Sequence, residues 1–165
     1  MDPTEAGTVR VYDVERYLQG VRRFMEDLIP FNKLLGIQAG RVERNYVELY
    51  LPFKEELLGN AVKGVLHGGA LSTLADAAGG AAVFASADFG DIISTIDLRI
   101  DYLRPAGPFD TLAEARVVRM GGRVGVARVQ MYQPEHKDAA ADDKWAAKTL
   151  VAEATAVYNV RRQVY

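Results

Sequence analysis

The chain has 165 residues, of which 49% are hydrophobic and 25% charged, and its formal net charge is −2 at pH 7. This length fits one domain with a sizeable core, and scattered basic residues on a slightly acidic chain give no electrostatic case for a nucleic-acid partner. There is no cysteine, and the two histidines are far apart, so disulfides, thiolate nucleophiles and an evident metal site are excluded.

An amphipathic helix is predicted near the N-terminus, after a polar segment, residues 1–12, that we expect to form a flexible arm. Asp13 is a typical N-cap. Apolar residues then recur at alternating four- and three-residue steps, the spacing of one helix face: Val14, Leu18, Val21, Met25 and Leu28. Pro30 lacks a backbone N–H and is expected to end this helix. Such a face normally packs on a core or covers an interface.

The middle of the chain combines a strand, a loop and a helix rich in glycine and alanine. Apolar and polar residues alternate over residues 47–51, which predicts a half-buried strand, and a loop over residues 53–66 follows it. The stretch 68–87 carries one charge near its centre and many small residues. We interpret it as a core helix that frays near residues 86–90, not as a membrane span. The polar first ten residues lack a signal-peptide core, so we expect a cytoplasmic protein with no membrane partner.

Asp76 is the most informative residue, because no other ionisable group lies between Gly68 and Ala85. A carboxylate in a buried helix costs several kcal/mol unless it is paired or performs chemistry. The first turn of a helix leaves N–H groups unpaired, and glycines at Gly68 and Gly69 let a ligand approach them. We interpret Asp76 as the catalytic carboxylate and the helix start as an oxyanion-binding site. A structural acid paired with a backbone or hydroxyl donor is the alternative.

Four strands are predicted after this helix: residues 92–102, 111–120, 123–133 and 148–161. In the first, apolar residues alternate with a polar set that contains Thr95, and the apolar set shares one face: Ile96, Leu98, Ile100 and Tyr102. Gly121-Gly122 is a signal for a two-residue hairpin, and residues 134–146 form a polar loop. The last strand lines up small residues on one face, as close approach of a helix requires: Ala152, Ala154 and Ala156.

The order of these elements indicates the architecture. A helix and two strands precede one long central helix, and an antiparallel meander follows it. Only the central helix carries enough small residues to lie tightly against a curved sheet. We therefore predict an α+β architecture in which a curved antiparallel sheet wraps around one buried helix, in a single domain over residues 13–165.

The central motif resembles that of a known family. The sequence Gly64-Val65-Leu66-His67-Gly68-Gly69, followed by Leu74-Ala75-Asp76, is similar to the HGG signature of the hotdog-fold acyl-CoA thioesterases, above all the phenylacetyl-CoA branch. Residues 95–105 resemble that family's next strand and residues 117–126 its glycine-rich hairpin. The resemblance implies the hotdog fold and hydrolysis of an acyl- or aryl-CoA thioester to free acid and CoA. It implies no cofactor, because coenzyme A is part of the substrate.

In that family the backbone N–H at the Gly68 position polarises the thioester carbonyl, and the carboxylate at the Asp76 position acts as general base or as nucleophile. Asp76 follows Gly68 by eight residues, about 12 Å along a helix, which is too far for both to act on one carbonyl within one subunit. The family forms dimers in which the carboxylate of one subunit faces the oxyanion site of the other. We therefore expect a homodimer that binds acyl-CoA, assembled further as a dimer of dimers.

Further site residues follow from the resemblance. Thr95 matches the Ser/Thr position that orients the attacking water or the carboxylate. Asn60 resembles the asparagine of the loop before the HGG motif, but it lies four residues before Gly64 where three are usual, so its role is open. His67 either shapes the helix start by bonding to the backbone or takes part in catalysis, and Gly69 belongs to the substrate site.

Other side chains are candidates for substrate binding. The basic residues that either meet CoA phosphates at the pocket mouth or are merely solvated are Lys63, Arg104, Arg119 and Arg123. Arg123 is favoured among them because it lies beside the glycine turn. The bulky residues expected to line an acyl pocket are Phe53, Leu57, Leu58, Phe84 and Phe89. Gly79-Gly80 serves helix packing or close approach of the substrate.

Two other functions stay open. A non-enzymatic acyl-CoA-binding module is the alternative from another class, although an acid opposite the carbonyl is an odd choice for a passive binder. A hotdog dehydratase or hydratase is less favoured, because it needs a histidine and an acid acting together. His67 lies at a glycine-flanked helix start and His136 in a polar loop, so neither fits that pattern.

Overall fold

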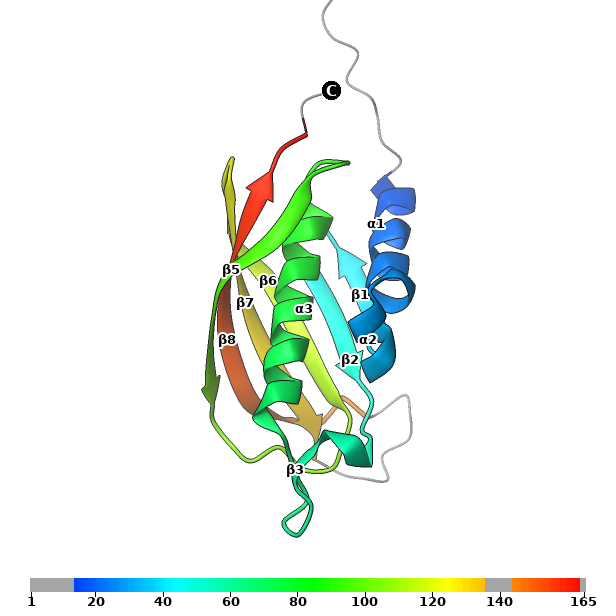
Figure 1. Ribbon diagram of the computed structural model, residues 1–165, viewed down its shortest axis with the longest axis vertical. Coiled ribbons are helices and arrows are strands. Elements are labelled where there is room, and N and C mark those ends of the chain that lie inside the picture. The colour runs from blue at the N-terminus through cyan, green and yellow to red at the C-terminus, as the bar shows by residue number, and fades with distance from the viewer. Residues whose placement is uncertain (1–13, 136–143, 164–165) are drawn as a thin grey trace, which may run out of the picture.

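A curved, six-stranded antiparallel sheet wraps around one long helix, α3 (Gly68–Ser86), as Figure 1 shows. The computed structural model describes residues 14–135 and 144–163, so the predicted arm 1–12, the cap Asp13 and His136 lie outside the described residues. The strands of this sheet are β1 (Gln38–Glu43), β2 (Tyr46–Leu51), β5 (Ile92–Tyr102), β6 (Thr111–Met120), β7 (Val124–Pro134) and β8 (Lys148–Arg161). The predicted α+β architecture, a curved sheet around a central helix, is confirmed.

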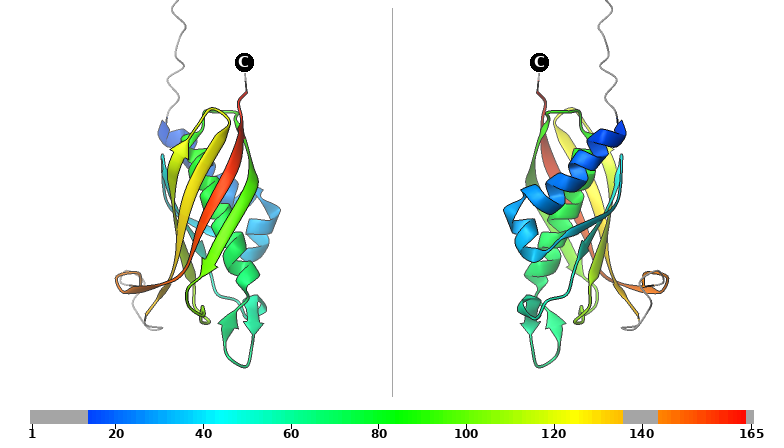
Figure 2. Two further views of the ribbon diagram at one scale, coloured as in Figure 1. Left: turned by 90° about the vertical axis from the view of Figure 1, so that its left-hand side faces the viewer. Right: turned by 90° about the vertical axis from the view of Figure 1, so that its right-hand side faces the viewer.

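The strands lie side by side in the order β1-β2-β6-β7-β8-β5. β6, β7 and β8 form a meander, but β5 pairs with β8 and not with β6, the strand that follows it in the chain. The prediction of one continuous meander is therefore wrong for β5. Alternation within a strand reveals which face is buried, but not which strand will be its neighbour. β5 lies at the edge of the sheet, beside β8, as the left view of Figure 2 shows.

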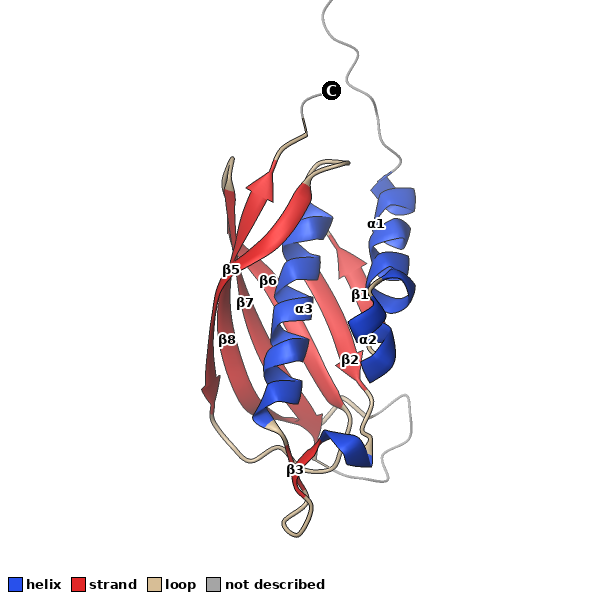
Figure 3. Cartoon of the chain, in the orientation of Figure 1, coloured by secondary structure: helices blue, strands red, loops and turns tan. Residues whose placement is uncertain are grey.

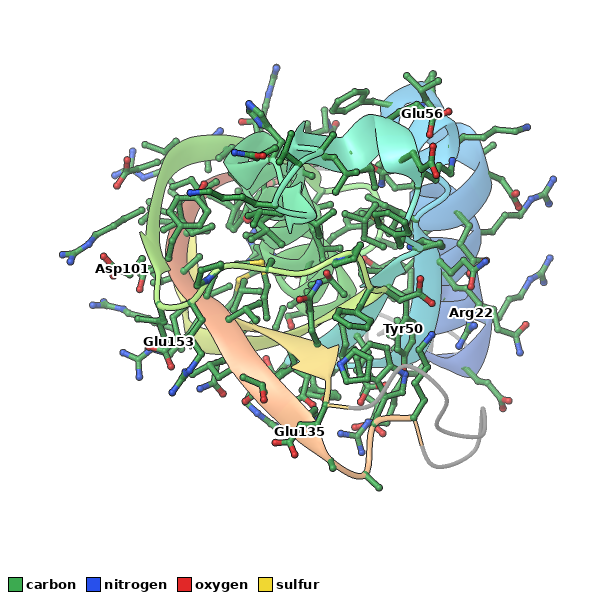
Figure 4. All side chains as sticks on the ribbon, turned by 90° about the horizontal axis from the view of Figure 1, so that it is seen from below. Arg22, Tyr50, Glu56, Asp101, Glu135 and Glu153 are labelled. Carbon is green, nitrogen blue, oxygen red and sulfur yellow. The ribbon has the colours of Figure 1, made fainter. Side chains whose placement is uncertain are left out.

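Small residues let α3 lie close to the sheet. The predicted alanine face of β8 is confirmed, because its three members are all buried: Ala152, Ala154 and Ala156. Tyr158 continues this face, and a Cβ on Gly79 would lie only 2.4 Å from the Tyr158 hydroxyl, so Gly79 serves packing. Figure 4 looks along α3 from below and shows Asp101 and Glu153 on the outside of the curved sheet, pointing away from the helix.

The predicted N-terminal helix consists of three pieces: α1 (Val14–Arg23), a π-helical turn η1 (Phe24–Leu28) and α2 (Pro30–Leu35). They cover one flank of α3, as Figure 3 shows. Pro30 interrupts the helix as predicted, but it also begins α2, where the missing N–H of proline costs nothing at the first helical position. The predicted apolar face is buried at Val21 and Met25, whereas Leu28 is 58% exposed.

Two connections differ in detail from the prediction. The predicted loop contains a 3-10 turn η2 (Glu55–Leu57) and a small hairpin of β3 (Leu58–Asn60) and β4 (Val65–Leu66), which projects beyond the start of α3 (Figure 3). The turn between β6 and β7 has three residues, 121–123, and neither of its glycines adopts the positive φ that two-residue hairpins use. None of the described helices has the length and apolar character needed to cross a membrane.

Candidate active site

A groove of about 340 Å³ runs along α3. The start of β5 forms one wall, and η1 and α2 form the other. The floor is a stripe of α3 residues at helical spacing: Thr73, Asp76, Ala77, Gly80, Ala81 and Phe84. The candidate carboxylate therefore lies in a groove whose floor beyond it consists of small and apolar residues.

The Asp76 carboxylate faces a hydroxyl group and not a cation. Thr95 Oγ1 donates a hydrogen bond of 2.8 Å to Asp76 Oδ1, and none of the ion pairs among the described residues involves Asp76. The side chain is half-buried and borders the groove, so the expectation of a fully buried carboxylate needs correction. Because no basic group neutralises it, this carboxylate is suited to accept a proton or to attack a carbonyl.

Tyr158 holds the turn of α3 that carries Asp76. Its hydroxyl donates to the Asp76 backbone carbonyl at 2.8 Å, in the space that Gly79 leaves open. Burial, with a smaller contribution from the Asp76 carboxylate, raises the pKa of the Tyr158 hydroxyl. The hydroxyl therefore stays protonated at neutral pH and remains a donor to the helix.

A β-bulge at Ile96 aims Thr95 at Asp76. Thr95 lies opposite Tyr158 on β8, but the next pair joins Asp97 to Val157, so Ile96 has no residue opposite it and is 58% exposed. The predicted alternation, which put Ile96 on the same face as Leu98 and Ile100, is thus wrong for this part of β5. The extra residue shifts the phase of the strand and turns Thr95 toward α3, and bulges often re-aim side chains beside active sites in this way.

The start of α3 has the features of an anion-binding turn. His67 is the N-cap, and its Nδ1 accepts the Gly69 N–H at 2.9 Å. A Cβ on Gly69 would lie 2.8 Å from that nitrogen, so the cap needs glycine there. Among the described residues no acceptor bonds the Gly68 N–H, which leaves this donor available at the positive end of the helix. Of the two roles expected for His67, shaping the helix start and taking part in catalysis, this geometry fits the first.

Gly68 and Asp76 border different hollows of the chain. A second hollow, of about 540 Å³, is lined by residues at the start of α3 and the end of β5, including Gly68, Gly69 and Tyr102. The Tyr102 hydroxyl donates to the Gly68 carbonyl at 2.9 Å and closes one side of this hollow. The hollow at the start of α3 and the groove around Asp76 have no lining residue in common. Within one chain, the carboxylate and the free N–H therefore do not meet.

The other polar candidates are spread over the molecule. Asn60 accepts the Lys63 backbone N–H at 3.0 Å and so shapes the turn of the β3–β4 hairpin. Arg104 borders the hollow around Gly68, and its Nη1 donates to the Leu150 carbonyl at 2.8 Å. Arg119 and Arg123 lie near the β6–β7 turn, at the opposite end of α3 from Gly68 (Figure 1). Of these three arginines, Arg104 is thus the one beside the helix start in the single chain.

Comparison with known proteins places the chain in a family. A family model described as the thioesterase superfamily matches residues 63–140. The medium/long-chain acyl-CoA thioesterase YigI of Escherichia coli is 30% identical over 163 residues, which cover 91% of this chain and 97% of the relative. The chain belongs to the thioesterase superfamily. It is a thioester hydrolase with the hotdog fold that its HGG motif predicted.

Two solved structures extend the similarity to the fold. A thioesterase family protein from Silicibacter pomeroyi superposes with a TM-score of 0.75 at 26% identity, covering 89% of this chain and 99% of that one. A protein from Shewanella oneidensis related to the thioesterase superfamily gives a TM-score of 0.71 at 31% identity, covering 88% and 96%. The likeness therefore spans nearly the whole chain and is not confined to the helix that bears the motif.

The acyl-pocket residues expected for this thioesterase are corrected in part. Phe84 borders the groove, but the other four do not: Phe53, Leu57, Leu58 and Phe89. The far wall comes instead from the N-terminal helices, chiefly Phe24, Ile29 and Phe31. Phe24 falls off the predicted apolar face of the first helix, and Phe31 lies just beyond the predicted end of that helix at Pro30. A bulky residue off the apolar face was the signal of a second contact surface. Among the described residues no three His, Asp or Glu side chains gather to hold a metal ion.

Proposed function

We propose that this thioesterase hydrolyses acyl-CoA thioesters to the free acid and CoA, with Asp76 as the catalytic carboxylate. The observation that carries the proposal is the Asp76–Thr95 pair, a carboxylate bonded to a hydroxyl and not to a cation, at one end of an apolar groove. The E. coli relative is named as a medium/long-chain acyl-CoA thioesterase, which supports a fatty acyl substrate. Water is the only other reactant that the reaction needs.

The proposed site is shared between two subunits. Eight residues of helix separate Gly68 from Asp76, a rise of about 12 Å, and the two border separate hollows. β5 is an edge strand with exposed apolar side chains at Ile92, Ile96 and Tyr102, and such an edge favours pairing with another strand. A second copy that adds its own β5 there would bring the Gly68 hollow of one subunit to the Asp76 groove of the other.

The Gly68 N–H would then stabilise the charge that develops on the thioester oxygen. This N–H belongs to the first turn of α3, where the helix dipole also favours negative charge. A donor of this kind lowers a barrier by roughly 3–4 kcal/mol in other acyl-transfer enzymes. Gly69 cannot share the task while its own N–H is bonded to His67.

Asp76 can complete the reaction in two ways. As general base it takes a proton from water while the water oxygen bonds to the carbonyl carbon, and the departing CoA thiolate then takes up that proton. As nucleophile it bonds to the carbonyl carbon and expels the thiolate, and water hydrolyses the resulting anhydride. In both routes Thr95 keeps the carboxylate oriented through the bond to its Oδ1.

The first test is thiol release from a panel of acyl-CoA thioesters. We expect Asp76→Asn to lower kcat by roughly 10³-fold with the fold retained, within the range of general-base catalysis. Glu43→Gln, which neutralises an exposed carboxylate on β1, is the control and should keep full activity. Full activity of Asp76→Asn would refute the role of the carboxylate. Binding without thiol release, or hydration of an enoyl thioester, would favour the two alternative functions.

A single turnover in ¹⁸O-labelled water separates the two routes. Direct attack of water on the thioester puts the label into the product acid. Attack of water on the Asp76 side of an anhydride leaves the label in the Asp76 side chain, where mass spectrometry of the peptide detects it. The label in Asp76 would exclude the general-base route.

A further inference from the structure

The groove extends much further on one side of Asp76 than on the other. Its α3 floor begins at Thr73, three residues before Asp76, and reaches Phe84, eight residues after it. Between Asp76 and Phe84 every floor residue is small: Ala77, Gly80 and Ala81. A chain that starts at the carboxylate thus finds open space along α3 until it meets the first large side chain, that of Phe84.

Phe84 is held by aromatic residues from two other elements. The Phe24 ring in η1 lies 5.4 Å from the Phe84 ring, and the Tyr17 ring in α1 lies 6.1 Å from it, edge-on. The Tyr17 hydroxyl also donates to the Phe84 carbonyl at 2.7 Å. Burial raises the pKa of Tyr17 to about 12, so this donor persists at neutral pH. These contacts from α1 and η1 hold the Phe84 side chain in a defined position in the groove.

We infer that Phe84 is the end stop of the acyl groove and sets the acyl-chain length that the enzyme prefers. The inference rests on the proposed function. Eight residues of helix span about 12 Å. An extended hydrocarbon chain advances roughly 1.3 Å per carbon, as its ~1.5 Å bonds dictate, so about nine carbons fit beyond the carbonyl. The preferred substrate is thus an acyl-CoA of medium length, with its methyl end against the Phe84 ring.

The test is a ladder of saturated acyl-CoA thioesters from two to eighteen carbons, read by thiol release as kcat/KM. The wild-type enzyme should be most active on acyl chains of about ten carbons, because about nine carbons beyond the carbonyl fill the groove as far as Phe84. Phe84→Ala should move the optimum upward by roughly four carbons, the length of the lost ring. Ala77→Leu fills the floor directly beyond Asp76 and should move the optimum to the shortest chains.

The matched control is Phe53→Ala, which removes the same ring outside the groove and should leave the optimum unchanged. If Phe84→Ala does not fold, Phe84→Leu keeps most of the packing and should shift the optimum in the same direction by less. An unshifted optimum in a folded Phe84 variant would overturn the end stop while leaving thioester hydrolysis intact. A wild-type enzyme that releases no thiol from any member of the ladder would overturn the proposed function, and the end stop with it.

Discussion

At the residue scale, position 68 allows the proposed oxyanion donor to be removed almost alone. Gly68 is the first residue of α3, where proline is favoured because the N–H has no partner within the helix. His67 before it has φ −67° and ψ 132°, a conformation that a residue preceding proline readily adopts. A Cβ on Gly68 would lie 3.1 Å from the hydroxyl at the end of the Tyr102 side chain, and because Tyr102 is 51% exposed, this side chain can shift.

We predict that Gly68→Pro folds but loses roughly 10²- to 10³-fold in kcat, the usual effect of deleting one oxyanion donor. Gly68→Ala is the matched control: it adds the same Cβ beside Tyr102 but keeps the N–H, so it should retain most of the activity. Steady-state kinetics and circular dichroism of both variants make the comparison. Equal activity of the two would show that the Gly68 N–H does not act on the carbonyl.

The residues of the site were more predictable from the sequence than their geometry was. The motif indicated Asp76 and Gly68, the resemblance of the following strand indicated Thr95, and the structure brings Thr95 to Asp76. The strand pattern alone would have turned Thr95 outward, because apolar residues alternate regularly from Ile96 onward. A bulge depends on pairing with a distant strand, here β8, and leaves no signal in local periodicity.

At the element scale, the junction of η1 and α2 shows how a side chain replaces a missing backbone donor. The Phe24 carbonyl is bonded by the Ile29 N–H, and the next N–H along the chain is absent because residue 30 is proline. The Met25 carbonyl therefore has no N–H at residue 30 to continue this pattern. Asn32 Nδ2 supplies one at 3.0 Å, and the Asn32 side chain is buried, with 4% of the residue exposed.

We predict that Asn32→Leu lowers the free energy of unfolding by about 1–3 kcal/mol, because the buried Met25 carbonyl loses its donor. Lys33→Leu, an equally apolar change at the exposed neighbouring residue of α2, should stay within about 0.5 kcal/mol. Urea titrations of both variants at one protein concentration give the two values. If Asn32→Leu is as stable as the wild-type protein, the bond to Met25 does not support the junction.

The elements that the sequence predicted best are those in which one local pattern decides the structure. The small residues of α3 and the alanines of β8 had to pack on each other, and both are buried. The neighbours of β5 and the existence of α2 were not predictable in this way. Strand order depends on long-range pairing, and a helix as short as Pro30–Leu35 has no room for a periodic signal.

At the scale of the whole molecule, one chain contains each half of the proposed site once, in separate places. The hollow at Gly68 and the groove at Asp76 share no lining residue, and they lie along the same helix. Two chains related by a two-fold axis would each supply one half to both sites. This arrangement has a consequence that single variants cannot test, because each of them damages both sites of a symmetric dimer.

We predict that a mixed dimer of one Asp76→Asn subunit and one Gly68→Pro subunit recovers activity that both parent dimers lack. One of its two sites combines the intact Asp76 with the intact Gly68, and the other combines both defects, so the activity should be about half that of the wild-type dimer. Coexpression with two different tags and tandem purification isolates the mixed species, and thiol release measures it. The wild-type dimer carrying the same tags is the control. An inactive mixed dimer would mean that each site is built within one subunit.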